Sequence, residues 1–210
     1  NSLGGNTTGA NNVSVGAHCL DANTTGSSNV AIGLDCLGKN TTGGSNTACG
    51  LSVLKENTTG SSNTAFGTQT LFNATASFNT AFGAYAMQNS TTGTNNIAIG
   101  PEVLKANTTA DYNTAVGRSC LKVNTTGSNN TAVGGLALDA NTTGNSSTAV
   151  GYNSLTANTT GSNTAVGKDA LEANTTGSSN TAIGLHALEK NTTASYNTAL
   201  GNASLINNTT

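Results

Sequence analysis

The chain has 210 residues and a formal net charge of −2, and only 8% of its residues are charged, against about 25% in typical globular domains. This near-neutral balance gives no basic surface for nucleic acid, and no apolar run reaches the roughly 18 residues of a membrane span. With 26 Gly but one Pro, collagen is excluded. We therefore expect neither nucleic-acid binding nor membrane insertion.

A 17-residue repeat organises the chain, which we interpret as a single repeat domain over residues 1–210. A partial unit at 1–5 comes first and another at 208–210 comes last, and two of the full units between them have sixteen residues. Repeats this short and regular predict a solenoid, in which each unit is one rung that contacts its neighbours. The full units begin at Asn6, Asn23, Asn40, Asn57, Asn73, Ser90, Asn107, Asn124, Asn141, Asn158, Asn174 and Asn191.

The elements follow in a fixed order within a unit, whose places we number from its first residue. The unit 174–190, NTTGSSNTAIGLHALEK, opens with turn formers that predict a corner, and its NTAI segment alternates like a short strand. A second strand is expected at the Ala-Leu segment. Between the strands, place eleven is always Gly, which suits a corner with positive φ or a close backbone approach. These corner glycines are Gly16, Gly33, Gly50, Gly67, Gly83, Gly100, Gly117, Gly134, Gly151, Gly167, Gly184 and Gly201.

The fold class that follows is all-β: a parallel β-solenoid (β-roll) of about twelve 17-residue two-stranded rungs. Rungs about 4.8 Å apart would give a rod of roughly 60 Å. The apolar residue of place ten and the Leu of place fifteen, Ile183 and Leu188 in the unit above, are expected to build the interior. Asn at places one and seven should form ladders along the stack.

Charge is confined to one edge of the predicted rung. Fifteen of the sixteen charged residues lie in places twelve to seventeen, and Asp111 is the exception. The opposite edge, with the sequence NTTGS, is neutral. It could carry glycans, pack against a partner chain or be hydrated.

The Asn-Thr-Thr triplets are sequons for N-glycosylation. Glycans on every site would crowd one another, because successive sites would stand only about 4.8 Å apart along the stack. A bare Asn ladder and partial glycosylation both remain open. The candidate sites are Asn6, Asn23, Asn40, Asn57, Asn107, Asn124, Asn141, Asn158, Asn174, Asn191 and Asn208.

Two cysteines, Cys19 and Cys36, occupy the same place in adjacent units. Their expected separation falls within the roughly 4.4–6.8 Å between Cα atoms that a disulfide needs. The alternative is that they, with Cys49 and Cys120, fill space as small buried residues. No Cys or His cluster predicts a metal site.

Aromatic residues accompany one change in the neutral corner. Where place four is Ala instead of Gly, place six is aromatic. The ring could cover the altered corner, or it could be a contact point for a partner chain or a sugar. The three candidate contact aromatics are Phe78, Tyr112 and Tyr196.

The sequence contains no set of residues that could form a catalytic site. The two histidines, His18 and His186, lie ten rungs apart, and the acids occur singly on the exposed edge. We expect no enzyme and no cofactor. Thr-rich solenoids also raise ice binding, but the adjacent Thr of places two and three would face opposite sides of a strand.

The kernel Asn-Thr-Ala-apolar-Gly followed by x-x-Ala-Leu, as in NTAVG at 113–117 and NTAIG at 180–184, resembles the head repeats of trimeric autotransporter adhesins. It is also similar to repeats in bacterial surface and phage fibre proteins. The resemblance covers all twelve units, although the unit here is longer. It implies a left-handed β-roll that acts as a trimer on a bacterial surface and binds host or matrix molecules.

These features together predict a structural segment of an extracellular or cell-surface filament, a stiff rod that stacks end to end with copies of itself. Lateral or trimeric contacts between copies are a further expectation. The alternative is an adhesin or phage receptor-binding fibre module that binds surface glycans or proteins. Ice binding is the remaining alternative.

Overall fold

The structure is a computed structural model that describes residues 1–209, so Thr210 of the last partial unit lies outside the described residues. The chain divides into two compact bodies, an N-terminal body (Asn1–Thr109) and a C-terminal body (Ala110–Thr210). Each body is a parallel β-solenoid, and no helix forms in residues 1–209.

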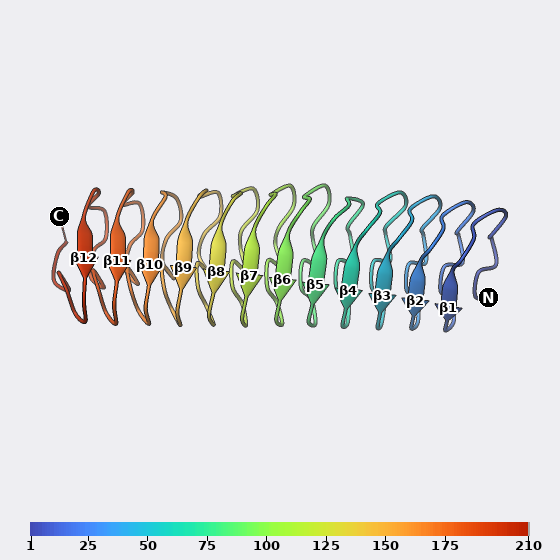
Figure 1. Cartoon of the computed structure of the whole chain (residues 1–210), viewed down its shortest axis with the longest axis horizontal. Coiled ribbons are helices and arrows are strands. Elements are labelled where there is room, and N and C mark those ends of the chain that lie inside the picture. The colour runs from blue at the N-terminus through green and yellow to red at the C-terminus, as the bar shows by residue number, and fades with distance from the viewer. Residues whose placement is uncertain (210) are drawn as a thin grey trace. The chain divides into compact units, whose positions relative to one another are not determined.

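The N-terminal body contains six three-residue strands that pair in parallel in chain order, one strand to a rung (Figure 1). The register places like residues opposite one another, as with Ala31 and Ala48. The strands are β1 (Val13–Val15), β2 (Val30–Ile32), β3 (Thr47–Cys49), β4 (Thr64–Phe66), β5 (Thr80–Phe82) and β6 (Ile97–Ile99).

The C-terminal body repeats this arrangement with six further parallel strands (Figure 1). Ala165 lies opposite Ala182 in the same register. The strands are β7 (Thr114–Val116), β8 (Thr131–Val133), β9 (Thr148–Val150), β10 (Thr164–Val166), β11 (Thr181–Ile183) and β12 (Thr198–Leu200).

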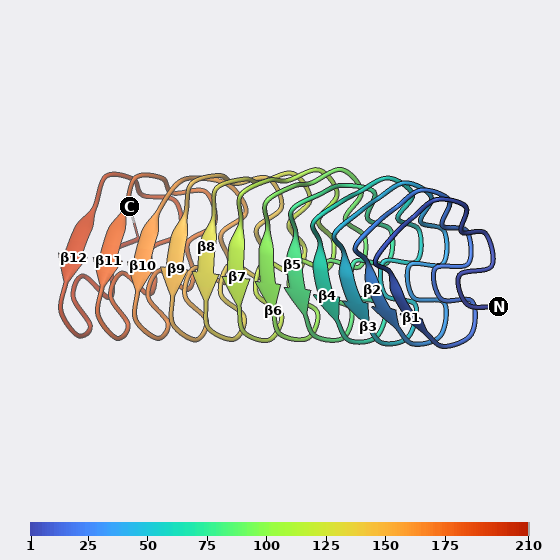
Figure 2. The ribbon, with the colours of Figure 1, turned by 45° about the vertical axis from the view of Figure 1, so that its right-hand side comes forward.

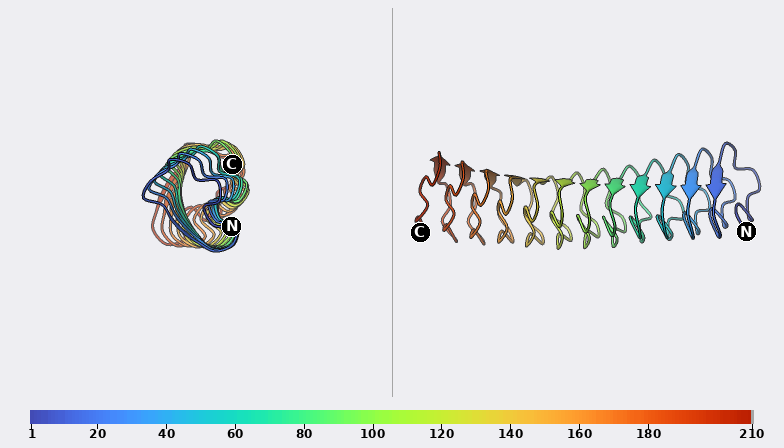
Figure 3. Two further views of the ribbon diagram at one scale, coloured as in Figure 1. Left: turned by 90° about the vertical axis from the view of Figure 1, so that its right-hand side faces the viewer. Right: turned by 90° about the horizontal axis from the view of Figure 1, so that it is seen from below.

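Backbone hydrogen bonds between rungs continue well beyond the strands. The N–H of Leu20 donates to the carbonyl of Cys36 at 3.1 Å, and the N–H of Thr24 donates to that of Thr41 at 2.9 Å. Figures 2 and 3 show each rung closing as a loop behind its strand. Because the irregular segments repeat every 17 residues, their polar groups find partners in the next rung, as buried backbone groups must.

The expected second strand of each rung does not form. The Ala-Leu segment is a turn segment, since the residues at places thirteen and fifteen take positive φ, as with Asp35 at 56° and Leu37 at 50°. A left-handed residue turns the chain and ends an extended run. The prediction of two-stranded rungs was wrong, although the parallel β-solenoid with its rungs of about 17 residues is confirmed.

The corner glycines hold the backbone where no other residue fits. Gly33 has a φ of 136°, and a Cβ added to it would overlap the carbonyl of Gly50 in the next rung. All twelve glycines of this column have φ between 118° and 137°. The corner therefore needs Gly both for its dihedral angle and for the close approach of successive rungs.

The core is a narrow stack of Leu and Ala. The Leu at place fifteen is fully buried from Leu20 to Leu188, with Met87 in the same column, and Ala31 and Ala165 of the strands are also fully buried. The prediction that Leu lies inside is confirmed. The prediction that place ten lies inside was wrong, because side chains alternate along a strand and the Ala at place nine takes the inward position.

Candidate functional site

The neutral corner is organised around a buried ladder of Asn side chains at place one. The amide Nδ2 of Asn40 donates to Oδ1 of Asn23 at 2.8 Å and to the carbonyl of Gly43 at 3.0 Å. In turn, Nδ2 of Asn57 donates to Oδ1 of Asn40 at 3.0 Å. The expected ladder is therefore present, and the amide of Asn40 uses both of its N–H groups and its oxygen.

A second ladder runs through the Asn residues of place seven. Asn46 donates from Nδ2 to Oδ1 of Asn29 at 3.1 Å and to the carbonyl of Gly60 at 2.9 Å. Its backbone N–H also donates to the same Oδ1 of Asn29 at 3.0 Å. Two interior polar ladders thus join successive rungs within each body, as between Asn23, Asn40 and Asn57 and between Asn29 and Asn46, beside the backbone bonds.

Most of the candidate glycosylation sites are buried, because their Asn side chains form the place-one ladder. An N-linked glycan replaces one hydrogen of Nδ2, and both hydrogens are in use at interior residues such as Asn40 and Asn174. Among the candidate sites, the exposed Asn6 and the half-buried Asn208 differ from the rest. The fully buried candidates are Asn23, Asn40, Asn57, Asn107, Asn124, Asn141, Asn158, Asn174 and Asn191.

Two rows of Thr behave differently. At place two the hydroxyl bonds along the stack, as Thr24 Oγ1 donates to the carbonyl of Thr41 at 3.0 Å. At place eight the Thr side chains lie on the outer face of the strands and are half-buried or exposed. This second row is unbroken from β7 to β12, where it comprises Thr114, Thr131, Thr148, Thr164, Thr181 and Thr198.

Beside the Thr row, place ten forms an outward apolar row. Ile32 is 40% exposed and Val15 is 56% exposed in the N-terminal body, and the rings of Phe66 and Phe82 stack with centroids 4.9 Å apart. In the C-terminal body the row holds Val116, Val133, Val150, Val166, Ile183 and Leu200. The sheet of the C-terminal body therefore presents a hydroxyl row beside an aliphatic row. In the N-terminal body the hydroxyl row is interrupted by Val13, Val30 and Ile97.

The charged edge is cross-linked by ion pairs between rungs. Lys39 Nζ lies 2.6 Å from Glu56 Oε2, and Lys55 Nζ lies 2.9 Å from Asp35 Oδ2. These pairs are partly exposed, so each contributes at most about 1 kcal/mol.

In the C-terminal body, Lys168 Nζ lies 2.7 Å from Asp169 Oδ2, and this hydrogen bond raises the pKa of Lys168. His186 Nδ1 lies 2.7 Å from Glu189 Oε2, and burial raises the pKa of Glu172 nearby. No group of three or more His, Cys, Asp or Glu side chains within residues 1–209 is placed to hold a metal ion.

The four cysteines have free thiols, and Cys19, Cys36 and Cys120 are buried. The thiols of Cys19 and Cys36 hydrogen-bond to each other, which lowers the pKa of Cys19 and raises that of Cys36. The candidate disulfide partners are thus adjacent, and the disulfide itself stays a prediction. Burial raises the pKa of Cys120 to about 11.

The three candidate contact aromatics project from the neutral corner. Phe78 is 61% exposed, Tyr112 is 62% exposed and Tyr196 is 86% exposed. Each has positive φ, 63°, 57° and 64° respectively. A bulky residue in this region is strained, and these rings gain little burial in return. The account in which the ring covers the corner therefore has little support from their packing.

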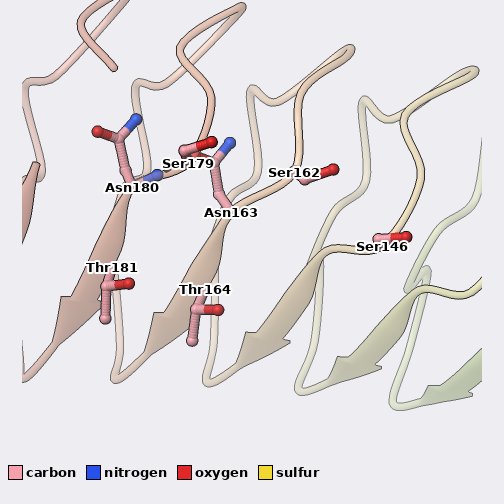
Figure 4. Close-up of a pocket in the computed structure, with 7 residues that line it drawn as sticks. All are labelled: Ser146, Ser162, Asn163, Thr164, Ser179, Asn180 and Thr181. Carbon is pink, nitrogen blue, oxygen red and sulfur yellow. Dashed lines mark hydrogen bonds between the residues drawn. The ribbon is translucent and has the colours of Figure 1, made fainter. Parts of the chain in front are cut away.

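A polar notch of about 250 Å³ opens on the outer side of the C-terminal body (Figure 4). It is lined by hydroxyls and amides from three successive rungs, with no charged side chain among them. Sequence reasoning missed these residues, although the shortened unit 158–173 is visible in the sequence. The lining residues are Ser146, Ser162, Ser179, Asn163, Asn180, Thr164 and Thr181.

The fold and these ladders define a β-solenoid repeat protein with buried Asn ladders. The chain matches no known protein-family model, characterised protein or solved structure. Across residues 1–209 there is no helix with the length and apolarity needed to cross a bilayer.

Proposed function

We propose that the chain is a structural segment of an extracellular filament, a stiff β-solenoid that associates with copies of itself. The observation that carries this proposal is the pair of buried Asn ladders, which join successive rungs through bonds such as Asn40 to Asn23 and Asn46 to Asn29. Together with the backbone bonds they make axial extension or bending break many hydrogen bonds at once. Such an interior suits a mechanical role.

End-to-end association follows from the form of any single rung. Each rung presents backbone donors and acceptors and ladder amides along the stack, and an uncovered rung can pair with a rung from another copy. The extracellular setting rests on the resemblance of the repeat kernel to surface adhesin heads and fibre proteins.

Lateral association of copies is supported by the outward apolar row. Ile32, Phe82 and Ile99 are 37–41% exposed on the strand face of the N-terminal body. A second copy carries the same row with the same repeat, so apolar side chains of two copies meet at every rung. Apolar burial of this kind contributes about 25 cal/mol per Å².

The proposal is tested by sedimentation velocity over a range of concentrations, with an Ile32→Glu/Ile99→Glu variant beside the wild-type chain. Both positions are exposed, so the variant should fold, and we expect it to lose lateral species that the wild-type chain forms. A wild-type chain that sediments as a monomer at every concentration would refute self-association.

Ice binding is a second candidate, favoured by the unbroken outward Thr row of β7 to β12. This outward row lies at place eight of the repeat, not at places two and three. Thr148 and Thr164 lie opposite each other in register, beside aliphatic residues at place ten. Thermal hysteresis that falls in a Thr148→Glu/Thr164→Glu variant would support this candidate, and its absence in the wild-type chain would remove it.

A further inference from the structure

We propose that the polar notch in the C-terminal body is a binding site for a neutral sugar residue of a glycan. The site lies between the corner segments of three successive rungs, with Ser146, Ser162 and Ser179 at its rim (Figure 4). It goes beyond the structural role proposed above and does not depend on it.

The notch exists because one rung is a residue short. The rung 158–173 passes from Gly161 to Asn163 through Ser162 alone, whereas the flanking rungs have two residues at this point. The flanking rungs carry Ser146 and Ser179 at place six, with φ of 57° and 60°. In the short rung, Gly161 takes positive φ instead, at 86°. The notch therefore lies where the place-six residue of a regular rung would stand.

The Asn ladders are disturbed at the same rung. The preceding rung has Ser147 at place seven in place of Asn, and its hydroxyl donates to the carbonyl of Gly161 at 3.0 Å. In the other ladder, Oδ1 of Asn141 and Nδ2 of Asn158 are buried and have no hydrogen-bond partner among the described residues. An unpaired buried polar atom destabilises the folded chain. The chain thus departs from its own repeat here at a cost in stability, and such departures concentrate at functional sites.

The chemistry of the notch selects a neutral, hydroxyl-rich ligand. Ser162 Oγ donates to the carbonyl of Asn145 at 2.8 Å, and Asn163 Nδ2 donates to the carbonyl of Gly177 at 2.7 Å, so the polar lining is held in place. Hydroxyls of Thr164 and Thr181 stand beside them on the strands. Hydroxyls act as both donors and acceptors, which matches the hydroxyls of a sugar. A volume of about 250 Å³ suits a single ring.

The rung that follows the notch carries an exposed aromatic ring, Tyr196, which is not among the lining residues. Tyr196 occupies place six in the rung after Ser179, and its N–H donates to the carbonyl of Ser178 at 3.1 Å. Its ring is 86% exposed on a backbone with φ of 64°. The ring gains too little burial to offset the strain of its backbone, so it does not stabilise the fold. A ring in the rung after a hydroxyl-lined notch offers a flat apolar surface for the C–H face of a sugar.

The test is saturation-transfer NMR on the full chain with maltotriose, cellotriose, triacetylchitotriose and galactobiose, and with a heparin fragment and inorganic phosphate as charged comparators. The main variant inserts one Ser after Gly161, which restores a 17-residue rung and fills the notch. Tyr196→Ala removes the ring, and Tyr112→Ala is its matched control at the same place. A Thr164→Val/Thr181→Val variant removes two hydroxyls without disturbing the strand, because Val13 and Val30 occupy that place elsewhere.

We expect at least one neutral sugar to receive saturation from the wild-type chain. The insertion should abolish this binding, Tyr196→Ala should weaken it about tenfold, and Tyr112→Ala should leave it unchanged. The Thr164→Val/Thr181→Val variant should weaken binding even if the insertion variant fails to melt cooperatively. Binding of the charged comparators alone, binding that survives in both the insertion and the double variant, or no binding of any sugar would overturn the proposal.

Sedimentation of the same samples separates this site from the structural role. If sugar binding is absent while self-association is unchanged, only the sugar-site proposal is refuted. If self-association is absent while sugar binding is intact, only the filament proposal is refuted.

Discussion

The amide of Asn40 donates to the side-chain oxygen of Asn23, seventeen residues earlier, across 2.8 Å inside a fully buried column. One repeat of 17 residues is therefore one turn of the solenoid, and it places each Asn directly beside its equivalent in the next rung. A polar side chain at this position is stable in the interior because its neighbours above and below are the same residue.

Replacing Asn40 with Ala should lower the free energy of unfolding by about 3 kcal/mol, because the donor of Asn57, the acceptor of Asn23 and the carbonyl of Gly43 each lose a partner. Asn40→Asp should be at least as damaging, since a carboxylate cannot donate. Chemical denaturation measures both. Asn89→Ala is the control, because Asn89 is exposed and should change stability by less than about 0.5 kcal/mol. Equal effects at Asn40 and Asn89 would contradict a stabilising ladder.

Gly33→Ala should destabilise the fold by more than about 3 kcal/mol, since the added Cβ meets the carbonyl of Gly50 on a backbone with φ of 136°. Gly38→Ala is the matched control, because the nearest atom to its added Cβ is the carbonyl oxygen of His18 at 3.3 Å. Thermal melts of both variants decide the matter. A Gly33→Ala chain that melts like Gly38→Ala would show that the corner tolerates a side chain.

The free energy of unfolding should decrease at alkaline pH because the buried thiol of Cys120 resists deprotonation. Its pKa is raised by burial from 9.0 to about 11 in the folded chain, so the unfolded chain loses the proton first. The stabilising contribution is complete below pH 9 and is lost as the pH rises through 11. We expect the wild-type chain to lose about 2 kcal/mol relative to Cys120→Ala over this interval. Denaturation of both proteins at pH 8, 9, 10 and 11 measures the difference, and a difference that is constant with pH would contradict it.

Glycosylation should distinguish Asn6 from Asn40. Asn6 is exposed, whereas a glycan at Asn40 would remove an N–H that the ladder uses. Folded chain secreted from a glycosylating host should therefore carry glycans at Asn6 and none at Asn40. Mass spectrometry of glycopeptides reports the occupancy. Full occupancy at Asn40 in cooperatively folded material would show that the ladder can open.

Much of the fold was predictable because a repeat makes each place visible many times over. The constancy of Gly33 and its equivalents, of Leu37 and its equivalents, and of Asn at two places led to the correct corner glycine, buried Leu column and Asn ladders. The second strand could not be excluded from the sequence, since Leu37 is an unfavourable residue for the φ of 50° that it adopts. That strain is offset by full burial, which only the structure reveals.

The outward direction of place ten was open to prediction and was missed. Once Ala31 is assigned inward, alternation along β2 sends Ile32 outward. The notch was harder to predict. Its signals, a missing residue after Gly161 and Ser147 in an Asn column, are visible in the sequence. Their meeting in one hollow depends on how three rungs stack.

The most direct test of the structural role is electron microscopy of the purified full chain and of its native material, alongside the Ile32→Glu/Ile99→Glu variant. We predict filaments or laterally associated bundles for the wild-type chain, with a repeat of about 4.8 Å along the axis in diffraction, and loss of bundling in the variant. Discrete, non-associating particles at every concentration, in both the purified and the native material, would contradict the account.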